Sequence, residues 1–228
     1  MTRVLAVALF LLVLACGTPS PRVVLLGDSI TWGLVSGKEG PSFAALLEEA
    51  LGQSVELRNV ACGGLTVALW LADAKPAFCH GEALAPNLFQ VRLLPLLPAD
   101  VVVVLLGTND SIGLGGRIEP EEYGRRMRRL TGQLVEHGAG RVLLLAPPFI
   151  NNSAKASVRL LAYGKQVAAI CAEREGVVCG PDLFELLEAH DFAANDPHPN
   201  RRGHAKIATA LEAQLRPLIG LSASPQGS

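Results

Sequence analysis

Residues 101–110 decide the fold of this 228-residue chain and read VVVVLLGTND. An unbroken run of β-branched and leucine side chains that ends at a glycine turn is typical of a strand buried on both faces of a parallel sheet. Residues 23–29, VVLLGDS, repeat this pattern near the start of the chain. Because ligands bind beyond the carboxyl ends of parallel strands, the polar residues that follow the two runs are the first candidates for a functional site.

Strand-like and helix-like segments alternate along the rest of the chain. Apolar or alternating runs bounded by turn residues predict three further strands, and apolar residues at helical spacing predict the helices between them. This order implies right-handed βαβ units and therefore an α/β fold, in which helices cover both faces of a parallel sheet. Residues 66–98 have no clear period, and we expect an irregular excursion that ends in a helix-like piece over 88–97. The predicted strands cover residues 55–60, 141–146 and 177–179, and the predicted helices cover residues 42–51, 119–135, 154–174 and 203–218.

Length and charge narrow the functional classes. A chain of 228 residues suits one domain with a full hydrophobic core. The 20 basic and 21 acidic residues nearly cancel, and no basic run is interleaved with aromatic residues, so the sequence gives no sign of nucleic-acid binding. The densest basic run, residues 125–129, would wrap around a helix and indicates a solvated helix face.

The first 21 residues differ in composition from the rest. Arg3 is followed by about a dozen apolar residues, too few to cross a bilayer core of roughly 30 Å, which is typical of a signal peptide. Residues 13–16, VLAC, resemble the lipobox of bacterial lipoproteins, which implies lipidation of Cys16 and export to the bacterial cell envelope. The lipid would be the only membrane contact. The alternative is ordinary signal-peptidase cleavage at or near Ala15, which would release a periplasmic or secreted protein. The expected organisation is a signal peptide at 1–15, a lipidated cysteine and tether at 16–21, one domain at 22–220 and a frayed tail at 221–228.

The remaining four cysteines form an even set, as expected in an oxidising compartment. Three pairings are possible, and the local pairs Cys62–Cys79 and Cys171–Cys179 need the least loop closure. The second pair would clip a helix end to the strand that follows it. Buried free thiols are the alternative. The chain has no C-x-x-C pair, which argues against a zinc site or redox chemistry.

Four loops carry the residues that could perform chemistry, and three of them directly follow predicted strands. They supply a serine hydroxyl, glycine amides, an asparagine side chain and a histidine. A serine becomes a nucleophile when an imidazole accepts its proton, and that imidazole needs a carboxylate on its other nitrogen. Backbone amides and an uncharged asparagine can stabilise the charge that develops on a carbonyl oxygen. The loops are Gly27-Asp28-Ser29, residues 59–64, residues 107–110 and residues 195–200, NDPHPN.

In this order the four loops resemble the sequence blocks of the SGNH, or GDSL-type, hydrolases, which include esterases, lipases and thioesterases. The resemblance spans the chain after residue 21 and implies a flavodoxin-like three-layer α/β/α sandwich around a mainly five-stranded parallel sheet. It implies that Ser29 is the catalytic nucleophile and His198 the general base. Gly64, five residues after Asn59 as in the family's second block, and Asn109 would complete the oxyanion hole with the Ser29 amide. The resemblance implies neither a cofactor nor a metal.

The catalytic acid departs from the family pattern. The family places its aspartate three residues before the histidine, where this chain has Asn195, while Asp196 stands one residue closer. Pro197 and Pro199 bias the residues before them towards extended backbone, in which residues i and i+2 point to the same side. Asp196 is therefore the favoured partner of His198, with Asn195 and a serine-histidine dyad as the alternatives.

The sequence predicts a serine hydrolase of the esterase or lipase type that cleaves a carboxylic ester or thioester through an acyl-enzyme. Its substrate would be a small-molecule or glycan ester. The same residues would serve an acyltransferase or deacetylase acting on envelope polysaccharide. A reading from another class is a lipoprotein that uses the fold for binding alone, and the shifted aspartate is the feature that favours it. Labelling of Ser29 by a fluorophosphonate separates the enzymes from the binding protein.

Other polar and aromatic residues near these loops are expected to have structural roles. Asp28 and Asp110 adjoin the catalytic positions and are interpreted as turn-forming carboxylates that bind backbone amides. Trp32 and Trp70 either line the acyl pocket or pack in the core. The histidines outside the NDPHPN loop are expected to be packed or exposed residues, and they are His80, His137, His190 and His204.

Overall fold

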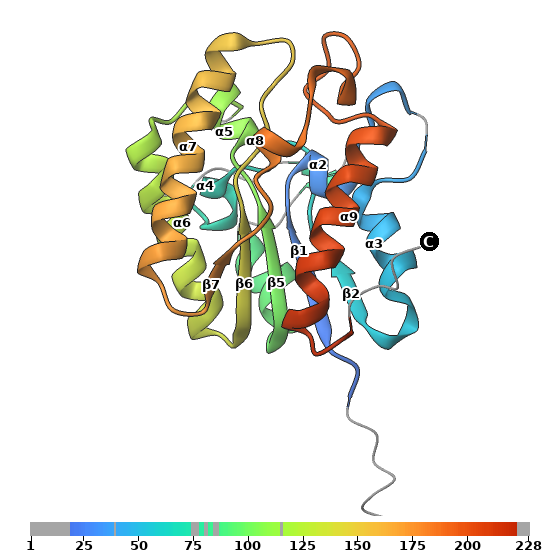
Figure 1. Ribbon diagram of the computed structural model, residues 1–228. Coiled ribbons are helices and arrows are strands. Elements are labelled where there is room, and N and C mark those ends of the chain that lie inside the picture. The colour runs from blue at the N-terminus through green and yellow to red at the C-terminus, as the bar shows by residue number, and fades with distance from the viewer. Residues whose placement is uncertain are drawn as a thin grey trace, which may run out of the picture.

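The carboxyl ends of five parallel strands meet at one edge of a sheet in the computed structural model (Figure 1). The strand order is β2-β1-β5-β6-β7, which confirms the predicted α/β fold with a five-stranded parallel sheet. The strands are β1 (Arg22–Gly27), β2 (Glu56–Asn59), β5 (Ala99–Leu105), β6 (Ala139–Leu145) and β7 (Val177–Cys179). The structure describes residues 19–38, 40–73, 78–79, 82–83, 87–114 and 116–222.

Helices cover both faces of the sheet (Figure 1). On one face lie α6 (Pro120–Glu136) and α7 (Ala154–Glu173), and on the other lie α3 (Phe43–Leu51) and α9 (Arg201–Leu218). Along β5, Val102 and Val104 belong to the core beneath α6 and α7, whereas Val101 and Val103 belong to the core beneath α3 and α9. Successive side chains of a strand point to opposite faces, so an unbroken apolar run is what two covered faces require.

The strands β1 and β5 end at the same level of the sheet. Gly27 lies opposite Leu105 in the register. A short helix follows each strand, α2 (Ser29–Trp32) after β1 and α5 (Thr108–Ile112) after β5. The two loops that were expected to carry a nucleophile and an oxyanion-hole side chain are therefore the first turns of helices that follow neighbouring strands.

The segment before β5 was predicted as a helix-like piece over 88–97, and it is helical without being an α-helix. It consists of a single π-helical turn, η3 (Phe89–Leu93), followed by a 3-10 turn, η4 (Leu94–Leu96). Pro95 lies in the middle of the predicted helix and Pro98 directly after it, and proline cannot donate a backbone hydrogen bond. The α-helical pattern therefore cannot continue through this segment.

Residue 203 was predicted as the start of the last helix, but α9 begins at Arg201 because the Asn200 side chain accepts the Arg202 N–H at 2.9 Å.

The rest of the excursion and the loops contain short elements only. The remaining elements are η1 (Ser36–Lys38), η2 (Gly52–Ser54), α4 (Val67–Trp70), an antiparallel pair of β3 (Phe78–Cys79) with β4 (Glu82–Ala83), α8 (Leu183–Leu186) and η5 (Ala189–Asp191).

Both local cysteine pairs are bonded in the structure. Cys62–Cys79 joins the loop after β2 to β3, and Cys171–Cys179 joins the last turn of α7 to β7. The predicted signal peptide, Cys16, His80 and residues 223–228 of the predicted tail lie outside the described residues. Within the residues that are described, no helix has both the length and the apolar character needed to cross a membrane.

Gly27 should tolerate no side chain, whereas Gly164 in α7 should. A Cβ on Gly27 would overlap the Thr31 side chain and lie 2.7 Å from the Leu105 carbonyl oxygen, while a Cβ on Gly164 would meet only Ala146, at 3.6 Å. We expect Gly27→Ala to lower the free energy of unfolding by about 2–3 kcal/mol. Gly164→Ala, the matched control, should raise it by about 0.5–1 kcal/mol, because alanine restricts the unfolded chain. Urea unfolding measures both, and equal effects of the two variants would contradict this picture of the strand end.

Candidate active site

The structure brings Ser29, His198 and Asp196 into one chain of hydrogen bonds. His198 Nε2 lies 2.9 Å from Ser29 Oγ, and His198 Nδ1 lies 2.7 Å from Asp196 Oδ1. With a carboxylate at Nδ1, the proton-bearing nitrogen is Nδ1, and Nε2 is left to accept the serine proton. Ser29 is 6% exposed, so its hydroxyl lies in the wall of the protein and not on a free loop.

The local sequence explains how Ser29 reaches this position. β1 ends at Gly27, and the Asp28 Oδ1 accepts the Ile30 N–H at 3.0 Å, which caps α2 with Ser29 as its first residue. Asn59, at the end of β2, donates from Nδ2 to the Thr31 carbonyl at 2.8 Å. The serine is therefore fixed by the strand before it and by a side chain from the neighbouring strand. Asn59 entered the sequence analysis only through its spacing to Gly64, and this second role was missed.

The expected oxyanion hole draws on three elements. Asn109 is buried in α5, and its Nδ2 donates one hydrogen to the Leu65 carbonyl at 2.9 Å, which leaves its second hydrogen for a ligand. Gly64 lies one residue before Leu65 with a φ of +77°. A Cβ on Gly63 would lie 3.9 Å from Ser29 Cβ, so the loop after β2 passes next to the serine. The loop after β2, which carries Gly64, therefore contacts Asn109 through the Leu65 carbonyl and passes next to Ser29.

The side chain that contacts the His198 ring is that of Asp196, and not that of Asn195, which stands at the family's usual position for the acid. Asp196 Oδ1 accepts two hydrogen bonds from His198, one from the backbone N–H at 2.9 Å and one from the ring Nδ1 at 2.7 Å. Asn195 is turned into the left-handed region, with a φ of +61°, and its carbonyl oxygen accepts a hydrogen bond from Asn152 Nδ2 at 3.0 Å. The structure therefore places at His198 the acid that the proline argument favoured.

Two further carboxyls lie buried behind the serine and the asparagine. Asp110 accepts the Val67 N–H at 3.3 Å, and Asp28 caps α2 as described above. Both therefore bind backbone amides, as interpreted from the sequence. Burial raises the pKa of Asp28 to about 7, with a smaller contribution from the Asp110 charge. Burial also raises the pKa of Asp110 to about 6.

His204 is a packed residue, as expected from the sequence. Its Nδ1 accepts the Phe43 N–H at 3.1 Å, and its Nε2 donates to the Leu34 carbonyl at 3.0 Å. Burial lowers the pKa of His204 to about 4, so the ring stays neutral and keeps both hydrogen bonds at neutral pH. It joins α9, α3 and the loop that follows α2.

One group of side chains in the described ranges could in principle hold a metal ion, and it consists of Glu188, His190 and Asp191. Two cations already occupy its carboxylates. Lys206 Nζ lies 2.6 Å from Asp191 Oδ2, and Arg202 Nε lies 3.1 Å from Asp191 Oδ1. A metal would have to compete with both, so we assign this cluster to the anchoring of the loop before α9.

The tryptophans differ in environment. Trp70 is fully buried and packs in the core, whereas Trp32 is 37% exposed. A Cβ on Gly63 would lie 3.9 Å from the Trp32 ring. The Trp32 ring and Ser29 therefore both lie next to the loop that follows β2. Trp70 therefore has the packing role, and Trp32 is the tryptophan that stays partly exposed.

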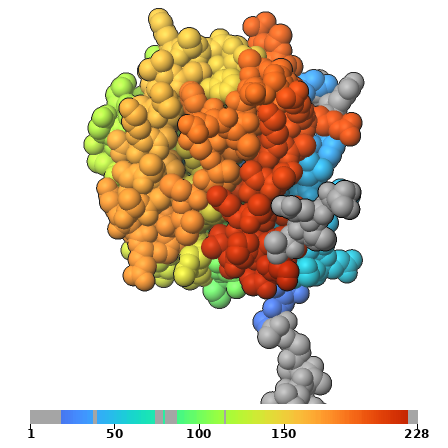
Figure 2. Space-filling model, viewed as in Figure 1, coloured from blue at the N-terminus to red at the C-terminus, as the bar shows by residue number. Residues whose placement is uncertain are grey.

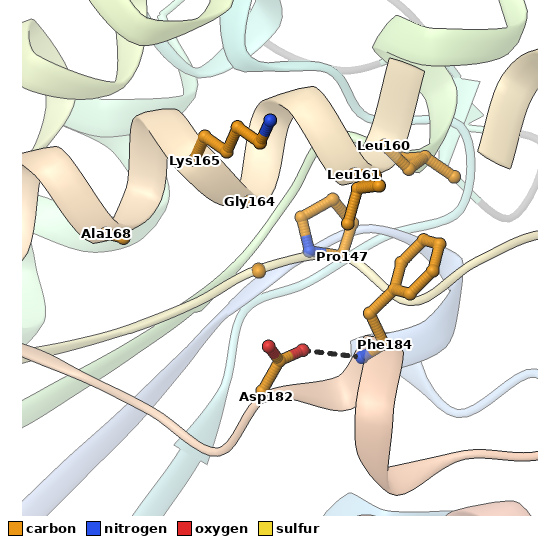
Figure 3. A pocket seen from close by; sticks show the side chains of 9 residues that line it. Pro147, Leu160, Leu161, Gly164, Lys165, Ala168, Asp182 and Phe184 are labelled. Atoms are coloured by element: carbon orange, nitrogen blue, oxygen red, sulfur yellow. Dashed lines mark hydrogen bonds between the residues drawn. The ribbon is translucent and has the colours of Figure 1, made fainter. Parts of the chain in front are cut away.

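A cavity of about 220 Å³ lies between α7 and α8, away from the serine. Figure 3 shows Pro147, Leu161 and Phe184 around it, with the Asp182 carboxylate turned towards the Phe184 amide, whose hydrogen bond it accepts at 2.9 Å. The acid in this cavity thus caps α8. Neither Ser29 nor His198 lines the cavity, and we assign it no function.

An α/β/α fold with serine, histidine and aspartate aligned at the carboxyl edge of its sheet is typical of serine hydrolases. The chain belongs to the GDSL-like lipase/acylhydrolase family, which matches it over residues 25–206, and it is an ester-bond hydrolase. No curated protein matches it by sequence.

Solved structures share the fold at low sequence identity. A carbohydrate acetylesterase family member from Sinorhizobium meliloti superposes with a TM-score of 0.70 at 18% identity, over 88% of this chain and 100% of its own. An aryl esterase from M. smegmatis gives a TM-score of 0.70 at 19% identity, over 87% and 99% of the two chains. An acetylxylan esterase from Geobacillus stearothermophilus gives 0.65 at 18% identity, over 91% and 97%.

Replacing the buried Asp28 should change how stability depends on pH. The folded protein keeps the Asp28 proton up to about pH 7, whereas the unfolded chain loses it near 3.8, so the free energy of unfolding falls as pH rises between these values and levels off above them. An asparagine at this position cannot ionise, and its Oδ1 can still cap α2. Relative to the natural protein, Asp28→Asn should therefore become more stable between pH 4 and pH 8, by on the order of 4 kcal/mol.

Urea unfolding at several pH values measures this difference. Asp182→Asn is the matched control, because Asp182 caps α8 in the same way from an exposed position. A stability difference for Asp28→Asn that stays constant from pH 4 to pH 8 would refute the burial of an ionisable Asp28.

Proposed function

We propose that this protein is a serine esterase that works through an acyl-enzyme on Ser29, with His198 as general base and Asp196 as its carboxylate partner. The observation that carries the proposal is the hydrogen-bond chain from Ser29 Oγ to His198 and on to Asp196, at 2.9 and 2.7 Å. Membership of an acylhydrolase family supports ester cleavage as the reaction.

In the first half of the reaction, Ser29 Oγ attacks the ester carbonyl carbon while His198 Nε2 takes its proton. The negative charge moves to the carbonyl oxygen, where the Ser29 and Gly64 amides and Asn109 Nδ2 would each donate a hydrogen bond. The tetrahedral intermediate collapses when the imidazolium passes its proton to the leaving alcohol. The acyl group then remains on Ser29 Oγ as an ester. A thioester would react in the same way, with a thiol as the leaving group.

In the second half, water takes the place of the alcohol. His198 Nε2 accepts a proton from this water as the water oxygen attacks the acyl carbon, and the same three donors bind the oxyanion. Collapse returns the proton to Ser29 Oγ and releases the carboxylic acid. Asp196 stabilises the imidazolium in both halves through its 2.7 Å contact with Nδ1.

For the substrate we propose short acyl esters, above all acetyl esters, of a carbohydrate. Two of the solved structures with the same fold are called a carbohydrate acetylesterase family member and an acetylxylan esterase.

We further propose export and lipid anchoring at Cys16, as the lipobox resemblance implies. β1 runs from Arg22 at one edge of the sheet to the serine at the other, which is about 20 Å along the strand (Figure 1). A tether of residues 16–21 spans at most about 20 Å, too little to bring the opposite edge round to the anchoring bilayer. A lipid-anchored form would therefore expose the site to polymers and solutes, which favours glycan esters over lipids of its own membrane.

Ser29 should react with a fluorophosphonate probe, and Ser29→Ala should abolish the labelling. The variant should also lower kcat for p-nitrophenyl acetate by about 10⁴-fold or more, because no other group replaces the nucleophile. Ser54→Ala, a change to an exposed serine in η2, is the matched control and should keep labelling and rate.

Across p-nitrophenyl esters, kcat/KM should fall as the acyl chain lengthens, and acetylated oligosaccharides should be deacetylated. Folded protein that takes no label would refute the esterase, and a preference for long acyl chains would refute the short-acyl proposal.

The mature protein should begin at a lipid-modified Cys16. Mass spectrometry of protein purified from a bacterial membrane fraction should show this modification, and Cys16→Ser should be unmodified and absent from that fraction. An unlipidated mature chain that begins near Cys16 would instead support cleavage by ordinary signal peptidase.

A further inference from the structure

Asp196 reaches His198 through a tight turn that residues outside the triad hold in place. The Asp196 N–H donates to the Ala193 carbonyl at 3.4 Å and closes a four-residue turn. Asn195 is the third residue of this turn, with a φ of +61°. The turn reverses the chain directly before Asp196, so its shape sets the direction in which the carboxylate leaves the backbone.

The left-handed backbone of Asn195 is a specific requirement of this turn. Among the described residues other than glycine, only Ala72 and Asn195 have a positive φ. Glycine adopts this conformation freely, asparagine tolerates it, and β-branched residues strongly disfavour it. The contact described for Asn195 goes to its carbonyl oxygen and not to its side chain. The residue therefore has its effect through the conformation of its backbone.

Side chains from two other loops bind this turn. Asn152, in the loop after β6, donates from Nδ2 to the Asn195 carbonyl at 3.0 Å. Ser36 Oγ, in the segment after α2, accepts the Ala193 N–H at 2.7 Å. Figure 2 shows the loop after β6, in yellow, next to the segment before α9, in orange, at one end of the molecule. The turn is thus held from the side of β1 and from the side of β6.

We propose that Asn195 and Asn152 are positioning residues for the catalytic acid. Asn195 supplies the left-handed backbone, and Asn152 fixes the Asn195 carbonyl, so that Asp196 points at His198 from one residue closer than the family pattern places it. This inference rests on the proposed function of the triad. It assigns no chemical step to either asparagine side chain.

The paired variants Asn195→Gly and Asn195→Val test the role of the backbone. Both remove the amide side chain, but only glycine keeps easy access to a φ of +61°. With p-nitrophenyl acetate as substrate, Asn195→Gly should keep kcat within about twofold of the natural protein. Asn195→Val should lower kcat by about 10–100-fold with KM changed by less than about twofold, because a misplaced carboxylate weakens the base and leaves substrate binding intact.

Asn152→Ala tests the hydrogen bond to the turn. It should lower kcat by about 3–10-fold, again with little change in KM. Asn151→Ala is the matched control, since Asn151 donates at 3.4 Å to the Ala189 carbonyl, which lies outside the turn, and it should behave like the natural protein. Thermal unfolding of all four variants identifies any that fail to fold.

Proton NMR provides a readout that does not depend on turnover. The Nδ1 proton of a histidine bound to a carboxylate resonates far downfield, so this signal should be present in the natural protein and in Asn195→Gly and weakened or shifted in Asn195→Val. If Asn195→Gly lost as much kcat as Asn195→Val, the asparagine side chain itself would be required and the proposal would be wrong. Unchanged kcat and NMR signal in folded Asn195→Val would also overturn it. Failure of the proposed function would look different, because the natural protein would hydrolyse no ester while the NMR signal still responded to the variants.

Discussion

The pairing of β1 with β5 sets the spacing on which the rest of the site depends. Gly27 lies opposite Leu105, so Asp28-Ser29, directly after β1, and Thr108-Asn109, which begin α5 shortly after β5, leave the sheet at the same edge. β2 ends lower, with Asn59 opposite Leu25, and the Asn59 side chain crosses the remaining distance to the Thr31 carbonyl. Since parallel register is held by many backbone hydrogen bonds, the separation of serine and asparagine is a property of the sheet and not of any one contact.

Loops that are buried at a sheet edge need partners for their backbone amides, and this need explains the ionisable groups around the site. Asp28 accepts the Ile30 N–H, Asp110 accepts the Val67 N–H, and His204 accepts the Phe43 N–H. An unpaired buried amide costs about 1–3 kcal/mol, so each side chain compensates for a loop that burial would otherwise destabilise. Burial raises the pKa values of Asp28 and Asp110 and lowers that of His204. Each shift favours the uncharged form of the side chain, which limits the charge packed behind the serine.

The sequence was informative where a pattern maps directly onto geometry. An unbroken apolar run such as residues 101–106 fits a strand whose two faces are both covered. The order of the four loops indicated the family. Loop length favoured both local cysteine pairs over the other pairings, and both are bonded in the structure. The choice between Asn195 and Asp196 rested on Pro197 and Pro199, a local constraint that the sequence does contain.

Other features depend on contacts between segments far apart in the chain, and no local pattern encodes them. Asn59, Ser36 and Asn152 each hold a site loop through a single hydrogen bond across the sheet edge. Their only local signal is a polar side chain at the end of a strand or in the segment after a strand or short helix, which is common in any α/β protein. The helix-like piece over 88–97 failed as an α-helix for a local reason, because its apolar spacing is helical while Pro95 excludes a continuous α-helix.

Asp196 both orients the His198 ring and shapes the backbone of the loop that carries it. Its Oδ1 accepts both the backbone N–H and the ring Nδ1–H of His198, so the atom that orients the imidazole also folds the segment that carries the imidazole. A substitution at Asp196 therefore disturbs loop and triad together, and its rate effect cannot be assigned to charge alone. Asn195 lies in the turn before Asp196, and Asn152 binds that turn. Substitutions at these two asparagines can therefore change the position of the Asp196 carboxylate without removing it. What the triad requires is a carboxylate at Nδ1, and a chain can meet that requirement with a different residue spacing if the backbone turns in compensation.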